Sequence, residues 1–156
     1  NRLQKNRPAT AKRAGQAIRK RLEKLEPPFW QALRDGDDQV ATQVSFCATM
    51  ARNLLLVEFL ESVVTDAFLT QAEALQAYQW DEFLAERAHR DEAIAGWAES
   101  SRRKMGQVVY RMLADVGVLA SSRSRKLQPL LLRPEVKSLL ETYQHERLQT
   151  CCRRLR

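Results

Sequence analysis

The side chains that most often catalyse reactions or hold metals are few in this sequence, and they are poorly placed for either task. The two histidines, His89 and His145, are far apart, and neither has a cysteine or carboxylate at metal-ligand spacing. Cys47 falls in an apolar helical stretch and is expected to be a small core residue. The adjacent Cys151 and Cys152 stand in a tail that we expect to fray. These residues predict neither a zinc site nor a cysteine–histidine pair for nucleophilic catalysis.

The acids of the stretch RDGDDQ, residues 34–39, are the remaining candidate for a metal cluster. Their simpler interpretation is a loop and a helix cap, in which Asp37 or Asp38 accepts hydrogen bonds from the first backbone amides of the next helix. No glycine-rich phosphate loop follows a strand, because the sequence has almost no strand-like run. We therefore expect no active site, no metal and no cofactor, in a protein that is not an enzyme.

A better candidate for function is the segment SSRRKMGQVVYRML, residues 100–113. At about 100° per residue, its apolar side chains fall on one side of a helix and four polar ones on the other. No acid occurs from Ser100 to Ala114, so we expect no i,i+4 ion pairs along the polar side. That side is either a solvated helix face or a surface for an acidic ligand, and Arg and Gln also read base edges in DNA. The apolar set is Met105, Val108, Val109, Met112, Leu113 and Val116; the polar set is Arg103, Lys104, Gln107 and Arg111.

The charge of the chain is distributed unevenly. Residues 1–26 hold nine Lys and Arg against two acids, residues 27–99 hold four against thirteen, and residues 100–156 hold thirteen against four. If the fold brings the two basic ends together, the protein has one strongly positive face. The candidate DNA-binding residues are Lys12, Arg13, Arg19 and Lys20, then Arg103, Lys104, Gln107 and Arg111, then Arg123, Arg125 and Lys126.

The elements that must position these side chains are predicted to be helices, and the fold class is all-α. Apolar periodicity and caps predict helices over 7–26, 27–36, 37–55, 80–90, 91–97 and 100–117, and a last helix from Pro134. The helix from residue 37 is expected either to continue past residue 55 or to break near Leu56–Glu61. The segments 118–120 and 127–132 flank a basic turn and allow a small β-hairpin. We expect a single helical domain over 1–156, with 80–132 in the order of a winged helix-turn-helix. The same order of elements also occurs in proteins that do not bind DNA.

Bulk composition narrows the class of protein further. Of the residues, 44% are hydrophobic and 29% charged, which is typical of a globular chain, and no apolar run is long enough to span a membrane. Three cysteines give no disulfide framework, which favours a reducing cytoplasm. The sequence starts at Asn1 without a methionine, so we expect it to be a portion of a longer protein.

Several stretches, in order from Arg7 to Glu141, together resemble the BrxA family of the bacterial BREX phage-defence systems. They are PATAKRAGQAIRKRLE, LRDGDDQVATQ, WDEFLAERAHRD, IAGWAESSRRKMGQVVYRMLADVGVL and SRSRKLQPLLLRPEVKSLLE. Members of that family carry additional N-terminal residues. The resemblance implies a helical bundle similar to the antitermination factor NusB. It also implies a non-catalytic, DNA-binding component of a defence locus, in the bacterial cytoplasm and associated with the nucleoid.

Three functions remain open from the sequence. The leading hypothesis is binding of duplex DNA, mainly through its phosphates, because of the two basic ends and the basic strip. The second is RNA binding, which rests on analogy with the NusB-like fold alone. The third is a scaffold that docks acidic proteins, among them other BREX proteins. We expect no membrane partner, and the oligomeric state is left open.

Overall fold

The computed structural model describes residues 24–156, and these form a mostly helical molecule without a sheet, which confirms the predicted fold class. The predicted first helix and the candidate residues Lys12, Arg13, Arg19 and Lys20 lie outside the described residues. The helices are α2 (Pro27–Asp35), α3 (Asp38–Arg52), α4 (Leu54–Phe59), the π-helical turn η1 (Leu60–Val64), α5 (Thr65–Leu69), α6 (Tyr78–Ala88), α7 (Glu92–Ala95), α8 (Glu99–Val116), α9 (Pro134–Thr142) and α10 (Glu146–Arg153).

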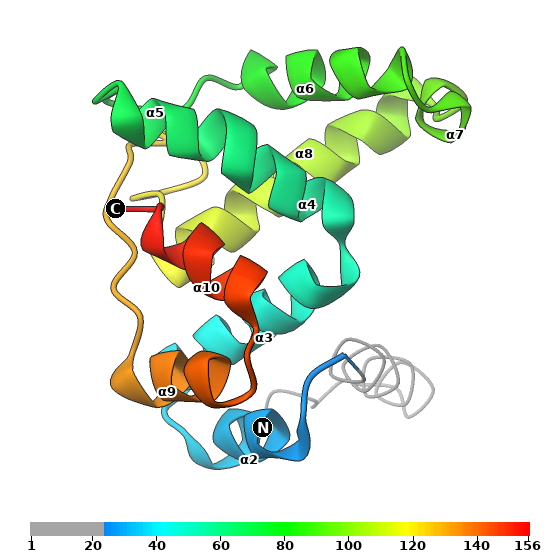
Figure 1. The fold of residues 1–156 in the computed structure, drawn as a ribbon. Helices are drawn as coiled ribbons and strands as arrows, with labels where there is room; N and C mark the ends of the chain where they lie inside the picture. The colour runs from blue at the N-terminus through cyan, green and yellow to red at the C-terminus, as the bar shows by residue number, and fades with distance from the viewer. Residues whose placement is uncertain (1–23) are drawn as a thin grey trace, which may run out of the picture.

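Helix α3 is the central element, and it packs against α2, α4, α8, α9 and α10 (Figure 1). It begins where the sequence predicts, because the Asp37 carboxylate accepts a 2.9 Å hydrogen bond from the amide of Val40. The helix is buried on more than one side: Val40, Val44 and Cys47 belong to the core, and so do Phe46 and Met50. An element covered by five others has to be apolar around most of its circumference.

The long helix predicted from residue 37 breaks at Asn53. The Asn53 side chain accepts a hydrogen bond from the amide of Leu56 and so caps the next helix. From Leu54 the chain runs through α4, η1 and α5 in a new direction. Within residues 24–156, no single helix has the length and apolar composition of a membrane span, although α3 and α4–α5, bent by 102° at the break, reach that composition together.

Helices α6, α7 and α8 follow the predicted pattern closely. Asp91 caps α7 through a hydrogen bond from the amide of Ala93, and Gly117 ends α8 in the left-handed conformation, with φ of 89°. Trp80 of α6 is fully buried, and its indole Nε1 donates a 3.1 Å hydrogen bond to the carbonyl of Arg102 in α8. A Cβ on Gly106 would lie 2.7 Å from Cδ1 of Trp80, so this glycine allows α8 to approach α6 closely.

The segment between α8 and α9 pairs with itself, but the described residues contain no regular β-strand. Leu119 and Leu127 form an isolated antiparallel bridge, and Lys126 bridges to Ala74. The amide of Ala120 donates to the carbonyl of Lys126 at 2.8 Å. The expected hairpin is therefore a turn held by single bridges, with Pro129 just beyond it, where the chain leaves the ladder.

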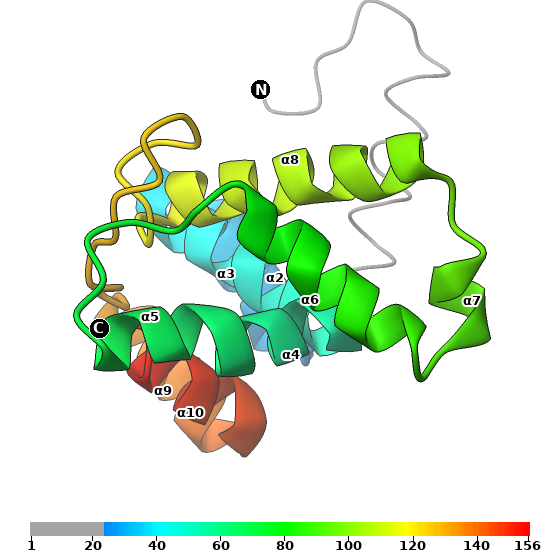
Figure 2. The ribbon, with the colours of Figure 1, turned by 90° about the horizontal axis from the view of Figure 1, so that it is seen from above.

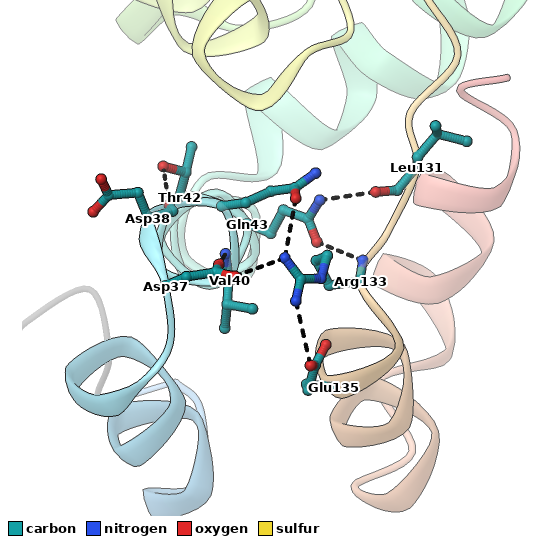
Figure 3. A network of polar contacts seen from close by, with 9 residues as sticks. Asp37, Asp38, Val40, Thr42, Gln43, Leu131, Arg133 and Glu135 are labelled. Carbon is teal, nitrogen blue, oxygen red and sulfur yellow. Dashed lines mark hydrogen bonds and ion pairs between the residues drawn. The ribbon is translucent and has the colours of Figure 1, made fainter.

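A polar network fastens the chain before α9 to the side of α3 (Figure 3). Gln43 is 1% exposed, and its amide nitrogen donates to the carbonyl of Leu131 while its amide oxygen accepts from the amide of Arg133. The Arg133 guanidinium in turn contacts Asp37 at 2.8 Å and Glu135 at 3.5 Å. Both the nitrogen and the oxygen of the buried Gln43 side-chain amide thus have a backbone partner.

The expectation that the C-terminal tail frays is wrong, because residues 146–153 form helix α10. Leu148, Cys151, Cys152 and Leu155 are buried in the core, at helical spacing through the helix and just past its end. The amide of Leu130 also donates a 2.7 Å hydrogen bond to the carbonyl of Leu155, which ties the end of the chain to the segment before α9. Burial raises the pKa of the Cys151 thiol to about 12, in keeping with a packing role.

Candidate nucleic-acid interface

Helix α8 is buried along one side and exposed along the other, as predicted, but the boundary between the two sides differs. Val109, Leu113 and Val116 belong to the core, and Tyr110 joins them although the sequence reasoning left it out of the apolar set. Val108 was expected on the buried side and is 56% exposed. The buried side of the helix is therefore centred closer to Tyr110 than the sequence predicts, and the apolar side chain of Val108 stays uncovered.

A hollow of about 350 Å³, which we call the basic groove, lies between α6, α8 and the turn at 121–125. Helix α8 contributes Arg103, Gln107 and Arg111, and the turn contributes Ser122 and Arg125. Four of the predicted site residues from two separate segments thus line one hollow. Ser122 and the carboxylate of Asp81 also line it, and neither was among the predicted site residues.

Arg125 is positioned by its own backbone and by a neighbouring loop. It adopts a φ of 54°, and its Nε donates a 3.1 Å hydrogen bond to the carbonyl of Leu75, while its own carbonyl accepts from the Leu75 amide. The Ser121 hydroxyl accepts from the amide of Ser124, which tightens the turn. These contacts hold the guanidinium of Arg125 at the edge of the groove rather than leaving it on a mobile side chain.

Tyr110 forms part of the groove wall and anchors α8 to the loop before α6. Its hydroxyl donates a 2.8 Å hydrogen bond to the carbonyl of Gln76. Burial raises the pKa of this phenol to about 12, so the hydroxyl stays protonated and keeps donating at neutral pH. The aromatic ring supports the groove and adds no charge to it.

The expected lack of i,i+4 ion pairs on α8 is wrong at its first turn. Arg103 Nη2 lies 3.4 Å from a carboxylate oxygen of Glu99, one residue before the acid-free stretch begins. Both side chains are highly exposed, and such a pair contributes little to stability and is weakened by salt. The Arg103 side chain thus remains free to turn toward a stronger anionic partner.

The other predicted residues are distributed around the groove. Lys104 and the turn residues Arg123 and Lys126 are exposed, and Lys104 lines a different hollow, on the α3 side of the helix. Arg102, by contrast, turns inward and donates to the carbonyls of Ile94 and Ala95 at the end of α7. Its cation stabilises the α7–α8 corner and is not part of the exposed strip.

The groove can bind an anion through several donors at once. It offers guanidinium, amide and hydroxyl groups, which are the side chains that contact phosphate oxygens and sugars in nucleic-acid complexes. Asp81 is the opposing charge, and it restricts where an anion can sit. Over residues 24–156, no group of three or more His, Cys, Asp or Glu side chains could hold a metal ion.

Comparison with known proteins gives one consistent result. A family model described as BrxA matches residues 1–144. The protein named BREX protein BrxA from Paramagnetospirillum magneticum is 36% identical over 151 residues, which are 97% of this chain and 76% of the relative. The protein of the same name from Escherichia coli O9:H4 is 33% identical over 141 residues, 90% of this chain and 66% of the relative. The chain thus spans about two thirds to three quarters of these relatives.

A solved structure shares the fold as well. The crystal structure of an uncharacterized protein from Magnetospirillum magneticum superposes with a TM-score of 0.81 at 33% sequence identity. The match covers 88% of this chain and 72% of that one.

Proposed function

This chain belongs to the BrxA family, and from that premise we propose that it serves a BREX defence system as a non-catalytic protein that binds duplex DNA. The basic groove contacts the phosphate backbone, and the exposed cations of the turn extend that contact. Other BREX proteins are its expected protein partners, since its relatives carry the name of that system.

The observation that supports DNA binding is the convergence of α8 and the turn. Arg103, Gln107 and Arg111 come from a helix, whereas Ser122 and Arg125 come from a segment more than ten residues further along. Surface cations that serve only solubility have no reason to gather with an amide and a hydroxyl in one hollow. Phosphate recognition commonly uses this combination of charge and directed donors.

The order of α6, α7, α8 and the turn supports a specific docking mode. In a winged helix-turn-helix, the last helix lies in the major groove and the wing contacts the backbone beside it. Here α8 takes the place of the recognition helix, and the turn at 121–125 takes the place of the wing. Residues 80–132 then act as a DNA-binding subregion of one helical domain.

A competitive salt titration tests the proposal. Fluorescence anisotropy of a labelled short duplex is measured against increasing NaCl, and single-stranded DNA and RNA of matched sequence serve as competitors. Contact with about five to seven phosphates gives a slope of log K against log salt of roughly −4 to −6. Absence of binding at low salt, or a slope near zero, contradicts the proposal. A clear preference for RNA shifts the function to RNA binding.

Two matched double variants locate the interface. Arg103→Ala with Arg111→Ala removes two cations from the groove, and Lys137→Ala with Arg153→Ala removes two from α9 and α10. Figure 2 shows α8 on the opposite side of the molecule from these two helices. The first variant lowers duplex affinity and makes the salt slope shallower by about 2, whereas the second does neither. Equal losses of affinity in both variants would mean that net charge, and not the basic groove, controls binding.

A further inference from the structure

The uncovered apolar arc of α8 faces a second hollow, of about 440 Å³, between α8 and the end of α3. We call it the apolar groove. Its floor consists of the buried residues Leu56, Trp80 and Val109, and its wall consists of Met105, Val108 and Met112. Only Arg52 and Lys104 among its lining residues carry a charge. An exposed valine over such a floor leaves apolar area in water that a cover would remove.

The described part of the chain starts near this groove. Figure 1 shows the start of the described chain, in blue, below the junction of α3 and α4, which holds the groove residues Arg52 and Asn53. Leu25 is already in the core, at 6% exposure. The described chain thus starts beside the α3 end of the groove, and twenty-three residues precede it in the sequence.

The sequence of that segment carries an apolar stripe that suits the groove. At about 100° per residue, Ala11, Ala14, Ile18 and Leu22 fall within an arc of roughly 80°. The two alanines allow close approach, and Ile18 and Leu22 supply the larger apolar surface. Because Lys12, Arg13 and Lys20 lie on the other half of the helical wheel, the stripe can be buried while they stay in water.

We propose that residues 9–22 dock as an amphipathic helix in the apolar groove, with Ile18 and Leu22 against Met105, Val108 and Met112. Burial of apolar side chains drives the docking. Charge attraction does not contribute, because Arg52 and Lys104 at the rim are positive like the segment. Its consequence is that Lys12, Arg13 and Lys20 stand on the outside of α8 near Lys104. That consequence, an extended basic surface, rests on the proposed DNA binding, whereas the docking itself does not.

Hydrogen exchange of the full chain, measured by mass spectrometry without nucleic acid, tests the docking. Peptides covering residues 9–22 are expected to exchange at least about tenfold more slowly than an unstructured peptide of the same sequence. Val108→Asp places a carboxylate in the groove and abolishes that protection, and so does Ile18→Asp. The matched control is Leu131→Asp, at a 71% exposed leucine outside the groove, which leaves the protection unchanged. Protection in α10 reports that each variant folds.

Changing the salt and the protein concentration distinguishes docking within one chain from docking on a second copy. Raising NaCl screens the repulsion between the segment and the rim, so protection of residues 9–22 increases or stays constant. Unstructured exchange rates in the unmodified chain, or protection that survives Val108→Asp, overturn the proposal. Protection that grows with protein concentration also overturns it, because the segment then docks on a second copy. None of these outcomes depends on the DNA titration, so docking and DNA binding fail separately.

Discussion

Arg133 and Arg147, on the α3–α9–α10 side of the molecule, differ from Arg111 of the basic groove in what they face. Arg133 lies 2.8 Å from the Asp37 carboxylate, and Arg147 makes two hydrogen bonds to Glu61, at 2.8 and 2.9 Å. The Arg147 guanidinium lowers the pKa of the Glu61 carboxyl. In the part of the chain that the structure describes, Arg111 has no such carboxylate partner.

This difference separates cations that hold the fold from cations that are available to a ligand. Paired arginines join elements far apart in the sequence, such as α3 to α9 and η1 to α10. Unpaired cations that gather in a hollow raise the local positive potential, and an anion that enters the hollow lowers it again. Composition alone cannot make this distinction, because both sets consist of the same residue type.

The largest effect is expected from breaking the α3 network at Gln43. Gln43→Leu leaves the partly buried carbonyl of Leu131 and amide of Arg133 without their partner, so we expect a loss of about 1–3 kcal/mol in unfolding free energy. Urea denaturation followed by circular dichroism measures it. The control is Gln31→Leu, at an exposed position on α2, with a loss below about 0.5 kcal/mol. DNA affinity of the folded fraction stays the same in both, and a selective fall with Gln43→Leu contradicts the separation of the two regions.

The next effect concerns the contact that supports the basic groove. Gly106→Ala places a methyl group 2.7 Å from Trp80 Cδ1, inside a packed interface, so α8 has to shift. We expect a cost of about 1–3 kcal/mol in unfolding free energy, together with weaker DNA binding because the groove changes shape. Gly96→Ala is the control, since its Cβ would meet only ordinary contacts, from 3.5 Å. Equal stability of the two variants would show that the close approach at Trp80 has no energetic weight.

The sequence was sufficient where a structure depends on neighbours along the chain. The Asp37 and Asp91 caps, the glycine end of α8 at Gly117 and the start of α9 at Pro134 are local, and each was predicted correctly. Helix α10 was missed because its burial depends on distant contacts, such as the hydrogen bond from Leu130 to Leu155.

For the site, the exposed strip of α8 could be predicted but its surroundings could not. Periodicity identified Arg103, Gln107 and Arg111, since one helix fixes their relative positions. The place of Arg125 beside them depends on Leu75, fifty residues earlier, and no pattern in the sequence indicates that contact. Val108 was misassigned for the same reason, because only the packing of α8 on α6 decides which part of a broad apolar arc is covered.

A smaller effect follows from giving the groove an acid of the kind that the α3–α9 side already has. Ser122→Asp places a carboxylate at the turn edge of the basic groove, where it pairs with a groove cation and repels phosphate. We expect duplex affinity to fall about threefold to tenfold at low salt, and by less at high salt. The matched variant is Ser138→Asp, at an exposed serine on α9, which leaves affinity nearly unchanged. An equal fall in both variants means that net charge, not the groove, controls binding.

The smallest effect comes from the reverse change, in which the groove loses the acid it has. Asp81 lines the groove with Arg103 and Arg111, so its charge opposes any phosphate that binds there. Asp81→Asn keeps the shape and removes the charge, and duplex affinity rises about twofold to threefold, as expected for an exposed charge. Glu82→Gln removes one charge from the same helix but outside the groove and changes affinity less. Because both variants alter net charge equally, a gain confined to Asp81→Asn identifies the groove as the place where the phosphate sits, and equal gains exclude it.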